Sequence, residues 1–152
     1  MLTIDRISFS QLESDPDFPR LVEDYATESR MPGLPSPIAK LPTYRTLNEN
    51  GLLTVFVAKA KGKLIGFVMV LFHEIPHYSL RVAMTESFFV FKWARSTGAG
   101  VSLRKIAEEF AREAGSCGLF ISTPVTGTLM DILPRVGYTK TNEVFFKSFS
   151  HE

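Results

Sequence analysis

The chain has 152 residues, a length that suits one domain around one hydrophobic core. Its 17 basic and 16 acidic residues leave a net charge of +1, which argues against nucleic acid or an anionic membrane as a partner. The single cysteine, Cys117, excludes an internal disulfide framework. No apolar run reaches the roughly 18 residues that span a bilayer, and the N-terminal sequence lacks the pattern of a secretion signal. We therefore expect a cytoplasmic protein.

The first part of the chain predicts a strand followed by helical segments. Residues 2–8 alternate between apolar and polar side chains, as in a short strand. Residues 11–29 carry apolar side chains at loose helical spacing. Residues 30–42 hold four prolines and indicate a loop, or a loop with a short helix that begins near Pro37. Such a loop is equally consistent with a mobile wall beside a substrate and with a plain connection.

A β-meander is predicted next. Residues 52–72 form two β-rich runs around a short connection that contains Gly62, which indicates a hairpin. Residues 81–91 form a third β-rich run, after a loop around Pro76, and should pair as the next strand of the meander.

The last third of the chain predicts helices and short strands. Apolar residues between 103 and 114 recur at i, i+3, i+4 and i+7, which predicts an amphipathic helix with Gly115 as its C-cap. The remaining predictions are a short buried strand over 118–123, a helix over 126–137 that stops near Pro134, and one or two closing strands over 138–149.

A turn with two glycines, Gly98 and Gly100, joins the third run to the amphipathic helix. The start of a helix leaves backbone N–H groups without partners, and with the helix dipole these form an anion site. Glycine lets a phosphate approach the main chain closely. Residues 97–102 therefore fit a diphosphate held by backbone amides, or an ordinary turn. The segment lacks the Gly-Lys-Ser/Thr ending of a nucleoside-triphosphate loop and the third glycine of a dinucleotide loop.

Residues 90–100, VFKWARSTGAG, resemble the acetyl-CoA loop of the GCN5-related N-acetyltransferases (GNAT family). The motif of that family, Arg/Gln-x-x-Gly-x-Gly/Ala at the end of its fourth strand, matches Arg95, Gly98 and Gly100. In addition, LPRVGY at 133–138 resembles the family's closing Gly-aromatic element. The resemblance covers roughly residues 63–149 in order. The sequence of residues 122–148 is similar to that of small family members that tailed bacteriophages encode.

The resemblance implies the GNAT acyl-CoA N-acyltransferase fold, of the α/β (α+β) class, as a single domain over residues 1–152. That fold has a central mixed, mostly antiparallel sheet of six or seven strands, flanked by about four helices. The resemblance also implies acetyl-CoA as donor, CoA as product and no metal. The diphosphate would lie on the loop amides, and the pantetheine would run along the fourth strand where it splays from the fifth. The cofactor-binding residues it implies are Val90, Phe91, Arg95, Thr97, Gly98, Ala99, Gly100, Val101 and Ser102. Arg95 would reach a CoA phosphate or cap loop carbonyls.

Glu86 is the candidate general base. It is the one acidic residue of the run 81–91, and strict alternation places it on the same face as Met84, Phe88 and Val90. A carboxylate on an apolar row is costly unless it has a partner, which is typical of functional acids. The resembled family often places a base near this position. The alternative is a bulge that turns Glu86 to solvent.

The general acid is less clearly marked. Many members of the resembled family carry a tyrosine in the helix before the Gly-aromatic pair, where this chain has Leu133 and then Pro134. Tyr138 is a candidate acid or the core aromatic of that pair, and Tyr44 and Tyr78 are candidates in expected loops. Transfer without a dedicated acid also stays open, because a thiolate is a tolerable leaving group.

The residues His73–His77 spell HExxH, the motif of zinc proteases, which works only on a helix. Here the motif follows a β-rich run, and Pro76 opposes a helix, so we expect the end of a strand and a loop. Cys117 has no paired histidine in its surroundings and is interpreted as a plain small residue.

The sequence thus predicts an N-acetyltransferase that transfers the acetyl group of acetyl-CoA to a primary amine by direct attack in a ternary complex. The acceptor is a small-molecule or protein amine, which we expect to enter between the hairpin loops and the proline-rich segment. The alternative is a weakly active or inactive GNAT-fold protein with a bacteriophage structural or host-interaction role. A homodimer is open, and a phage-encoded chain would act in the host cytoplasm.

Overall fold

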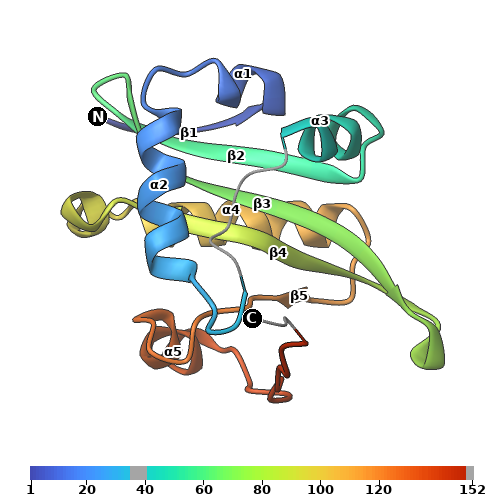
Figure 1. Cartoon of the computed structure of the whole chain (residues 1–152). Coiled ribbons are helices and arrows are strands. Elements are labelled where there is room, and N and C mark those ends of the chain that lie inside the picture. Colours follow the sequence, from blue (N-terminus) through green and yellow to red (C-terminus); the bar gives the residue numbers. More distant parts are fainter. Residues whose placement is uncertain (35–40, 150–152) are drawn as a thin grey trace.

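The computed structural model describes residues 1–34 and 41–149, which form one five-stranded sheet with helices on both faces (Figure 1). In their order across the sheet the strands are β1 (Leu2–Ile7), β2 (Leu53–Ala60), β3 (Lys63–Ile75), β4 (Leu80–Val90) and β5 (Leu119–Phe120). The helices are α1 (Phe9–Glu13), α2 (Phe18–Ser29), α3 (Leu41–Glu49), α4 (Ala99–Glu113) and α5 (Leu129–Ile132). Short 3-10 segments lie at Pro76–Tyr78, Lys92–Thr97 and Leu133–Val136.

The predicted meander is confirmed. Strands β1 to β4 pair antiparallel, and β5 pairs parallel with β4, so the sheet is mixed. The β2–β3 turn consists of Lys61 and Gly62, both with positive φ (+51° and +76°). Two such residues give a turn whose twist matches that of the flanking strands.

Aromatic contacts assign each face of the sheet to its helices. Phe56 of β2 packs against Phe110 of α4, with ring centroids 5.4 Å apart. Phe67 of β3 and Phe89 of β4 pack against Tyr25 of α2, at 5.7 and 6.0 Å. Helices α1, α2 and α3 therefore cover one face, and α4 covers the other (Figure 1).

The amphipathic helix α4 begins directly after Gly98, and its C-cap is Ala114, one residue before the predicted Gly115. Gly115 has a φ of +80°, and its N–H donates to the carbonyl of Arg112 at 3.1 Å. The N–H of Ser116 donates to the carbonyl of Ala111 at 2.9 Å. These two bonds close the helix in a Schellman motif.

The predictions for the C-terminal part are wrong in two respects. Residues 138–149 contain no strand, so the described part of the chain has five strands rather than six or seven. Val144 and Phe145 are 84% and 90% exposed, so no neighbouring strand covers them. In addition, β5 has only two residues, and Phe120 is 38% exposed rather than buried. An edge of two residues offers few backbone partners to a further strand.

Helix α3 occupies part of the segment for which a loop was expected. It begins at Leu41, with Pro42 at a first-turn position where no helical N–H bond is lost. The short helix expected to begin near Pro37 lies outside the described residues. None of the helices within residues 1–34 and 41–149 is long and apolar enough to cross a membrane.

Candidate functional site

The glycine turn connects the end of β4 to the start of α4. Gly98 adopts the left-handed conformation, with φ +84° and ψ 2°, immediately before the first residue of the helix. The first bond of α4 runs from the N–H of Ser102 to the carbonyl of Gly98, at 3.0 Å. The amides of Ala99, Gly100 and Val101 therefore precede the helical ladder. The hydroxyl oxygen of Thr97 accepts a long bond of 3.3 Å from the Ala99 N–H.

The space above this turn is open. A Cβ built on Gly98 meets no atom within 4 Å, and one on Gly100 comes no closer than 4.0 Å to Val90 Cγ2. Backbone conformation requires glycine at position 98, whereas packing within the chain does not require it at position 100. An open cradle over helix-start amides fits the diphosphate of CoA, so the residues present are compatible with the cofactor that the sequence predicts.

Among the described residues, no strand pairs with the outer edge of β4 beside this turn. Strand β5 pairs with β4 only at Ala83 and Met84, so the two strands separate beyond Met84. Val90 and Phe91 are buried, at 6% and 2% exposure. A ligand that runs along them would therefore meet the backbone edge of the strand rather than their side chains.

Arg95 is held by the protein itself. Its Nε donates to the carbonyl of Val90 at 3.1 Å, and its Nη2 donates to both carboxylate oxygens of Glu28, at 2.8 and 2.6 Å. Glu28 lies on α2, so Arg95 ties this helix to the end of β4. Of the two roles considered for Arg95, the geometry favours capping of a carbonyl, and contact with a CoA phosphate stays a prediction.

Glu86 lies at a β-bulge. Ser87 pairs with Met69 and Thr85 pairs with Val70, so Glu86 is the extra residue of β4. Phe88 pairs with Val68, which in turn pairs with Phe56 on the α4 face. Glu86 instead bonds to Tyr44 of α3, on the opposite face.

The expected alternation is therefore wrong for Phe88 and Val90, because the bulge places Glu86 on the face opposite to theirs. It is correct for Met84, which pairs with Leu71 and lies on the same face as Glu86. The alternative prediction of a bulge is confirmed, but the bulge does not turn Glu86 to solvent. Glu86 is only partly exposed, and its Oε2 atom is fully buried.

Tyr44 is the tyrosine that contacts Glu86, the predicted general base. Its hydroxyl donates to Glu86 Oε1 at 2.7 Å. Burial, together with this bond to Glu86, raises the pKa of Tyr44 above its usual range. Burial and the charge of Glu86 also raise the pKa of Tyr25 on α2. Glu86 Oε2 has no hydrogen-bond partner within the described ranges.

The other tyrosine candidates lie elsewhere. The Tyr138 hydroxyl donates to Glu108 Oε1 of α4 at 2.7 Å, and burial together with this bond raises the pKa of Tyr138. Tyr78 lies on the 3-10 turn at the tip of the β3–β4 hairpin and is 64% exposed. The structure thus brings Tyr44 to Glu86, and neither Tyr138 nor Tyr78. No sequence motif marks Tyr44, and its position on a helix was not predicted.

The HExxH residues do not lie on a helix. His73 and Glu74 belong to β3, and His77 lies in the 3-10 turn that follows, as the sequence predicts. Within residues 1–34 and 41–149, no group of three or more His, Cys, Asp or Glu side chains could hold a metal ion.

Comparison with known proteins supports one family. Residues 18–127 match the model of the acetyltransferase (GNAT) family. The fold is similar to that of a ribosomal-protein-alanine N-acetyltransferase from Brucella melitensis biovar Abortus 2308, with a TM-score of 0.74 and 16% identity over 99% of this chain and 100% of that chain. No curated protein sequence matches the chain.

Two further solved structures show the same likeness. The aminoglycoside acetyltransferase meta-AAC0020, from an uncultured soil metagenomic sample and in complex with sisomicin, has a TM-score of 0.75 and 18% identity over 99% of this chain and 97% of that chain. A predicted acetyltransferase with acetyl-CoA, from Clostridium acetobutylicum, has a TM-score of 0.73 and 13% identity over 97% of this chain and 96% of that chain. At such identities the likeness shows the fold alone.

Proposed function

The chain belongs to the acetyltransferase (GNAT) family, and on this premise we propose that it transfers the acetyl group of acetyl-CoA to a primary amine. One observation carries the proposal. A single strand, β4, places the acid Glu86 at its bulge, and the 3-10 segment Lys92–Thr97 leads from the end of this strand to the open glycine turn before α4. A cradle for the donor and a candidate base are thus linked by one short continuous stretch of the chain.

The residues that would hold the donor follow from this arrangement. The amides of Ala99, Gly100 and Val101, which precede the helical ladder, would receive the diphosphate, and the Ser102 N–H is already bonded to Gly98. The backbone edge of β4 beyond Met84 would receive the pantetheine arm. When bound, acetyl-CoA supplies an activated thioester whose leaving group is a thiolate. The Arg95 side chain holds the carbonyl of Val90 and so keeps the end of β4 in place for this contact.

Glu86 removes the proton that prevents the acceptor from attacking. A primary amine is mostly an ammonium ion near neutral pH, and it must lose one proton before its lone pair can react. Glu86 Oε2, which has no protein donor in the described part of the chain, receives this proton directly or through one water molecule. The Tyr44 hydroxyl occupies the other oxygen.

A general acid is not needed to complete the transfer, since a thiolate is a tolerable leaving group. Tyr138 stays a prediction for this role. To act, its hydroxyl would have to leave Glu108, to which it is bonded.

The acceptor is an amine of a small molecule or of a protein. The similar structures include proteins described as a ribosomal-protein-alanine N-acetyltransferase and an aminoglycoside acetyltransferase, so one fold serves both kinds of acceptor. A cytoplasmic location, a bacteriophage origin and a homodimer stay predictions.

The test is an acceptor screen that measures free thiol released from acetyl-CoA, with the wild type and with Glu86→Gln. We expect release that depends on a primary amine, and a kcat about 10²- to 10⁴-fold lower in Glu86→Gln with unchanged affinity for acetyl-CoA. Normal turnover of Glu86→Gln across the pH range would remove Glu86 from the mechanism. No amine-dependent release from the wild type would favour the inactive, host-interaction alternative.

A further inference from the structure

We propose that Tyr44 is a positioning residue for Glu86: its hydroxyl holds one carboxylate oxygen, which leaves the other, buried and without a protein donor among the described residues, to take the proton of the acceptor amine. The inference rests on the proposed function and deepens it. It starts from the unequal surroundings of the two oxygens. Oε1 accepts a 2.7 Å bond from Tyr44, whereas Oε2 is buried and has no partner among the described residues.

A buried carboxylate oxygen without a donor is unfavourable, and native proteins keep few such atoms without a functional reason. A donor that arrives with the substrate removes the cost at Oε2 when the side chains that cover this atom make room for it. The ammonium group of an acceptor, or a water molecule bonded to it, is a donor of this kind. The bond to Tyr44 makes the choice of oxygen unique, because Oε1 is already occupied.

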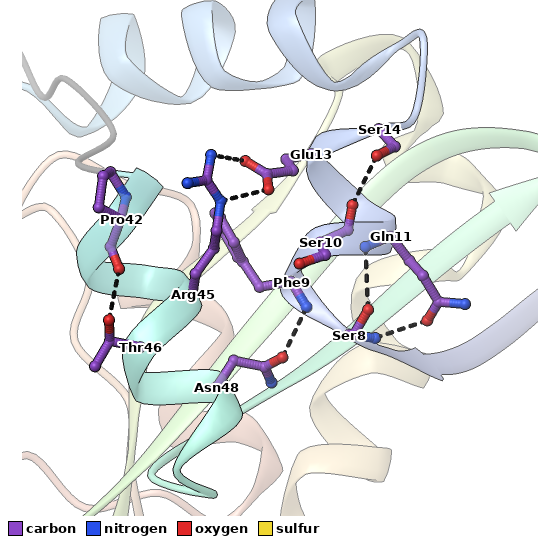
Figure 2. Close-up of polar contacts among 10 residues, drawn as sticks. All are labelled: Ser8, Phe9, Ser10, Gln11, Glu13, Ser14, Pro42, Arg45, Thr46 and Asn48. Atoms are coloured by element: carbon purple, nitrogen blue, oxygen red, sulfur yellow. Dashed lines mark hydrogen bonds and ion pairs between the residues drawn. The ribbon is translucent and has the colours of Figure 1, made fainter.

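Tyr44 is itself held by contacts between α3 and α1, shown in Figure 2 for the neighbouring residues. Arg45 donates from Nε and Nη2 to the two carboxylate oxygens of Glu13, at 2.6 and 2.9 Å. The Tyr44 ring stacks on Phe9 of α1, with centroids 5.2 Å apart and planes 18° apart. These contacts fix the direction in which the phenol points.

One turn along α3, Asn48 adds a second attachment on the same side of the helix as Tyr44. Its Oδ1 accepts from the Phe9 N–H at 2.9 Å, and its Nδ2 donates to the carbonyl of Leu53 in β2 at 2.8 Å (Figure 2 draws the first bond). The helix that carries Tyr44 is thus attached to both α1 and the sheet. A phenol on such a support can hold a carboxylate in one orientation.

The contact with Glu86 also separates Tyr44 from the role of a general acid. A phenol has one proton, and that proton lies in the bond to Glu86 Oε1. Tyr44 therefore acts through Glu86 and not on the leaving thiolate. Tyr25 of α2 is the other phenol near the carboxylate, and its hydroxyl makes no bond to Glu86 in the described part of the chain.

The test is a double-mutant cycle with Tyr44→Phe, Glu86→Gln and the double variant, measured by thiol release. Tyr44→Phe keeps the ring that stacks on Phe9 and removes only the hydroxyl. We expect its kcat to fall about 10- to 100-fold, with the KM for acetyl-CoA within about twofold of the wild type. In the Glu86→Gln background the same change should have no further effect, because the group it positions is gone.

Tyr25→Phe is the matched control, since it removes a phenol near Glu86 without removing a bond to it, and it should keep the wild-type kcat. Full activity of Tyr44→Phe, or losses that multiply in the double variant, would overturn the positioning role. An ultraviolet titration of tyrosinate provides a readout without catalysis: Glu86→Gln should move the ionisation of both Tyr44 and Tyr25 to lower pH. In the Tyr25→Phe background only the shift of Tyr44 should remain, and an unchanged titration in that background would contradict the contact. Absence of amine-dependent release from the wild type would instead reject the proposed function.

Discussion

Gly66 of β3 and Val90 of β4 approach each other so closely that no side chain fits at position 66. A Cβ built on Gly66 would lie 2.8 Å from Val90 Cγ2 and 2.8 Å from the carbonyl oxygen of Phe89. The carbonyl of Val90 is the group that Arg95 caps, and Val90 Cγ2 is the atom nearest to a Cβ at Gly100. The position of the glycine turn therefore depends on a glycine that lies outside the motif.

Gly66→Ala should displace the end of β4 and disturb the turn. We expect the free energy of unfolding to fall by about 1–3 kcal/mol from overpacking, and acetyl-CoA to bind more weakly. Chemical denaturation and titration calorimetry measure the two effects. Gly118→Ala is the control, because its Cβ would meet no atom within 4 Å. Wild-type stability of Gly66→Ala would contradict the account.

The glycine at position 100 should tolerate alanine but not a long side chain. Gly100→Ala places a Cβ 4.0 Å from Val90 Cγ2, an ordinary contact, and favours the helix by up to about 1 kcal/mol. The family motif also accepts alanine at this place, so acetyl-CoA should still bind. Gly100→Leu should fill the cradle and abolish binding while the melting temperature stays near that of the wild type. Unchanged affinity of Gly100→Leu would reject the loop assignment.

The bonds of Arg95 should contribute unequally to stability. The ion pair with Glu28 is about one-third exposed on both sides (31% and 34%), so Glu28→Gln should cost only about 0.5–1 kcal/mol. Arg95→Ala also removes the cap on the Val90 carbonyl and should cost about 1 kcal/mol more. Denaturant titration of both variants checks the order. A larger loss in Glu28→Gln than in Arg95→Ala would be inconsistent with the capping role.

Stability should decrease at alkaline pH because of Tyr44 and Tyr138. In the folded protein the pKa of both phenols is raised by burial and by a bonded carboxylate. An unfolded tyrosine ionises near pH 10, so the contribution is complete below about pH 10 and is lost as the pH rises further. The slope is at most about 1.4 kcal/mol per pH unit for each phenol, reduced by solvent screening since both are partly exposed.

Denaturation curves between about pH 9 and pH 11 measure this slope. The variant with both Tyr44→Phe and Tyr138→Phe lacks the two ionisations, and its stability should decline less steeply over the same range. Equal slopes for this variant and the wild type would show that neither phenol is responsible.

The meander and the glycine turn could be predicted because their signals are local. Lys61–Gly62 between β-rich runs specifies a hairpin, and Gly98 before an amphipathic segment marks the start of α4. The Tyr44–Glu86 contact joins residues 42 positions apart and depends on a bulge, for which alternation of side chains gives no sign. Helix α3 was not predicted either, because the prolines in and before it indicated a loop.

The closing strand was predicted from local residue types, but a strand also needs a neighbouring strand edge, which local residue types do not reveal. Val144, Phe145 and Phe146 are residues typical of strands, yet they are 84%, 90% and 50% exposed and extend no sheet. Strand propensity describes how well a side chain fits a pleated, half-buried surface, and it cannot supply the neighbouring edge. With β5 only two residues long, that edge is absent in the described part of the chain.

The most direct test of the central claim is a calorimetric titration of the wild-type protein with acetyl-CoA, with CoA and NADH as comparison ligands. We expect saturable binding of acetyl-CoA and of CoA and no binding of NADH, because the open turn at Gly98 and Gly100 has the motif of a CoA site and lacks the third glycine of a dinucleotide loop. No binding of acetyl-CoA up to millimolar concentration would contradict this claim.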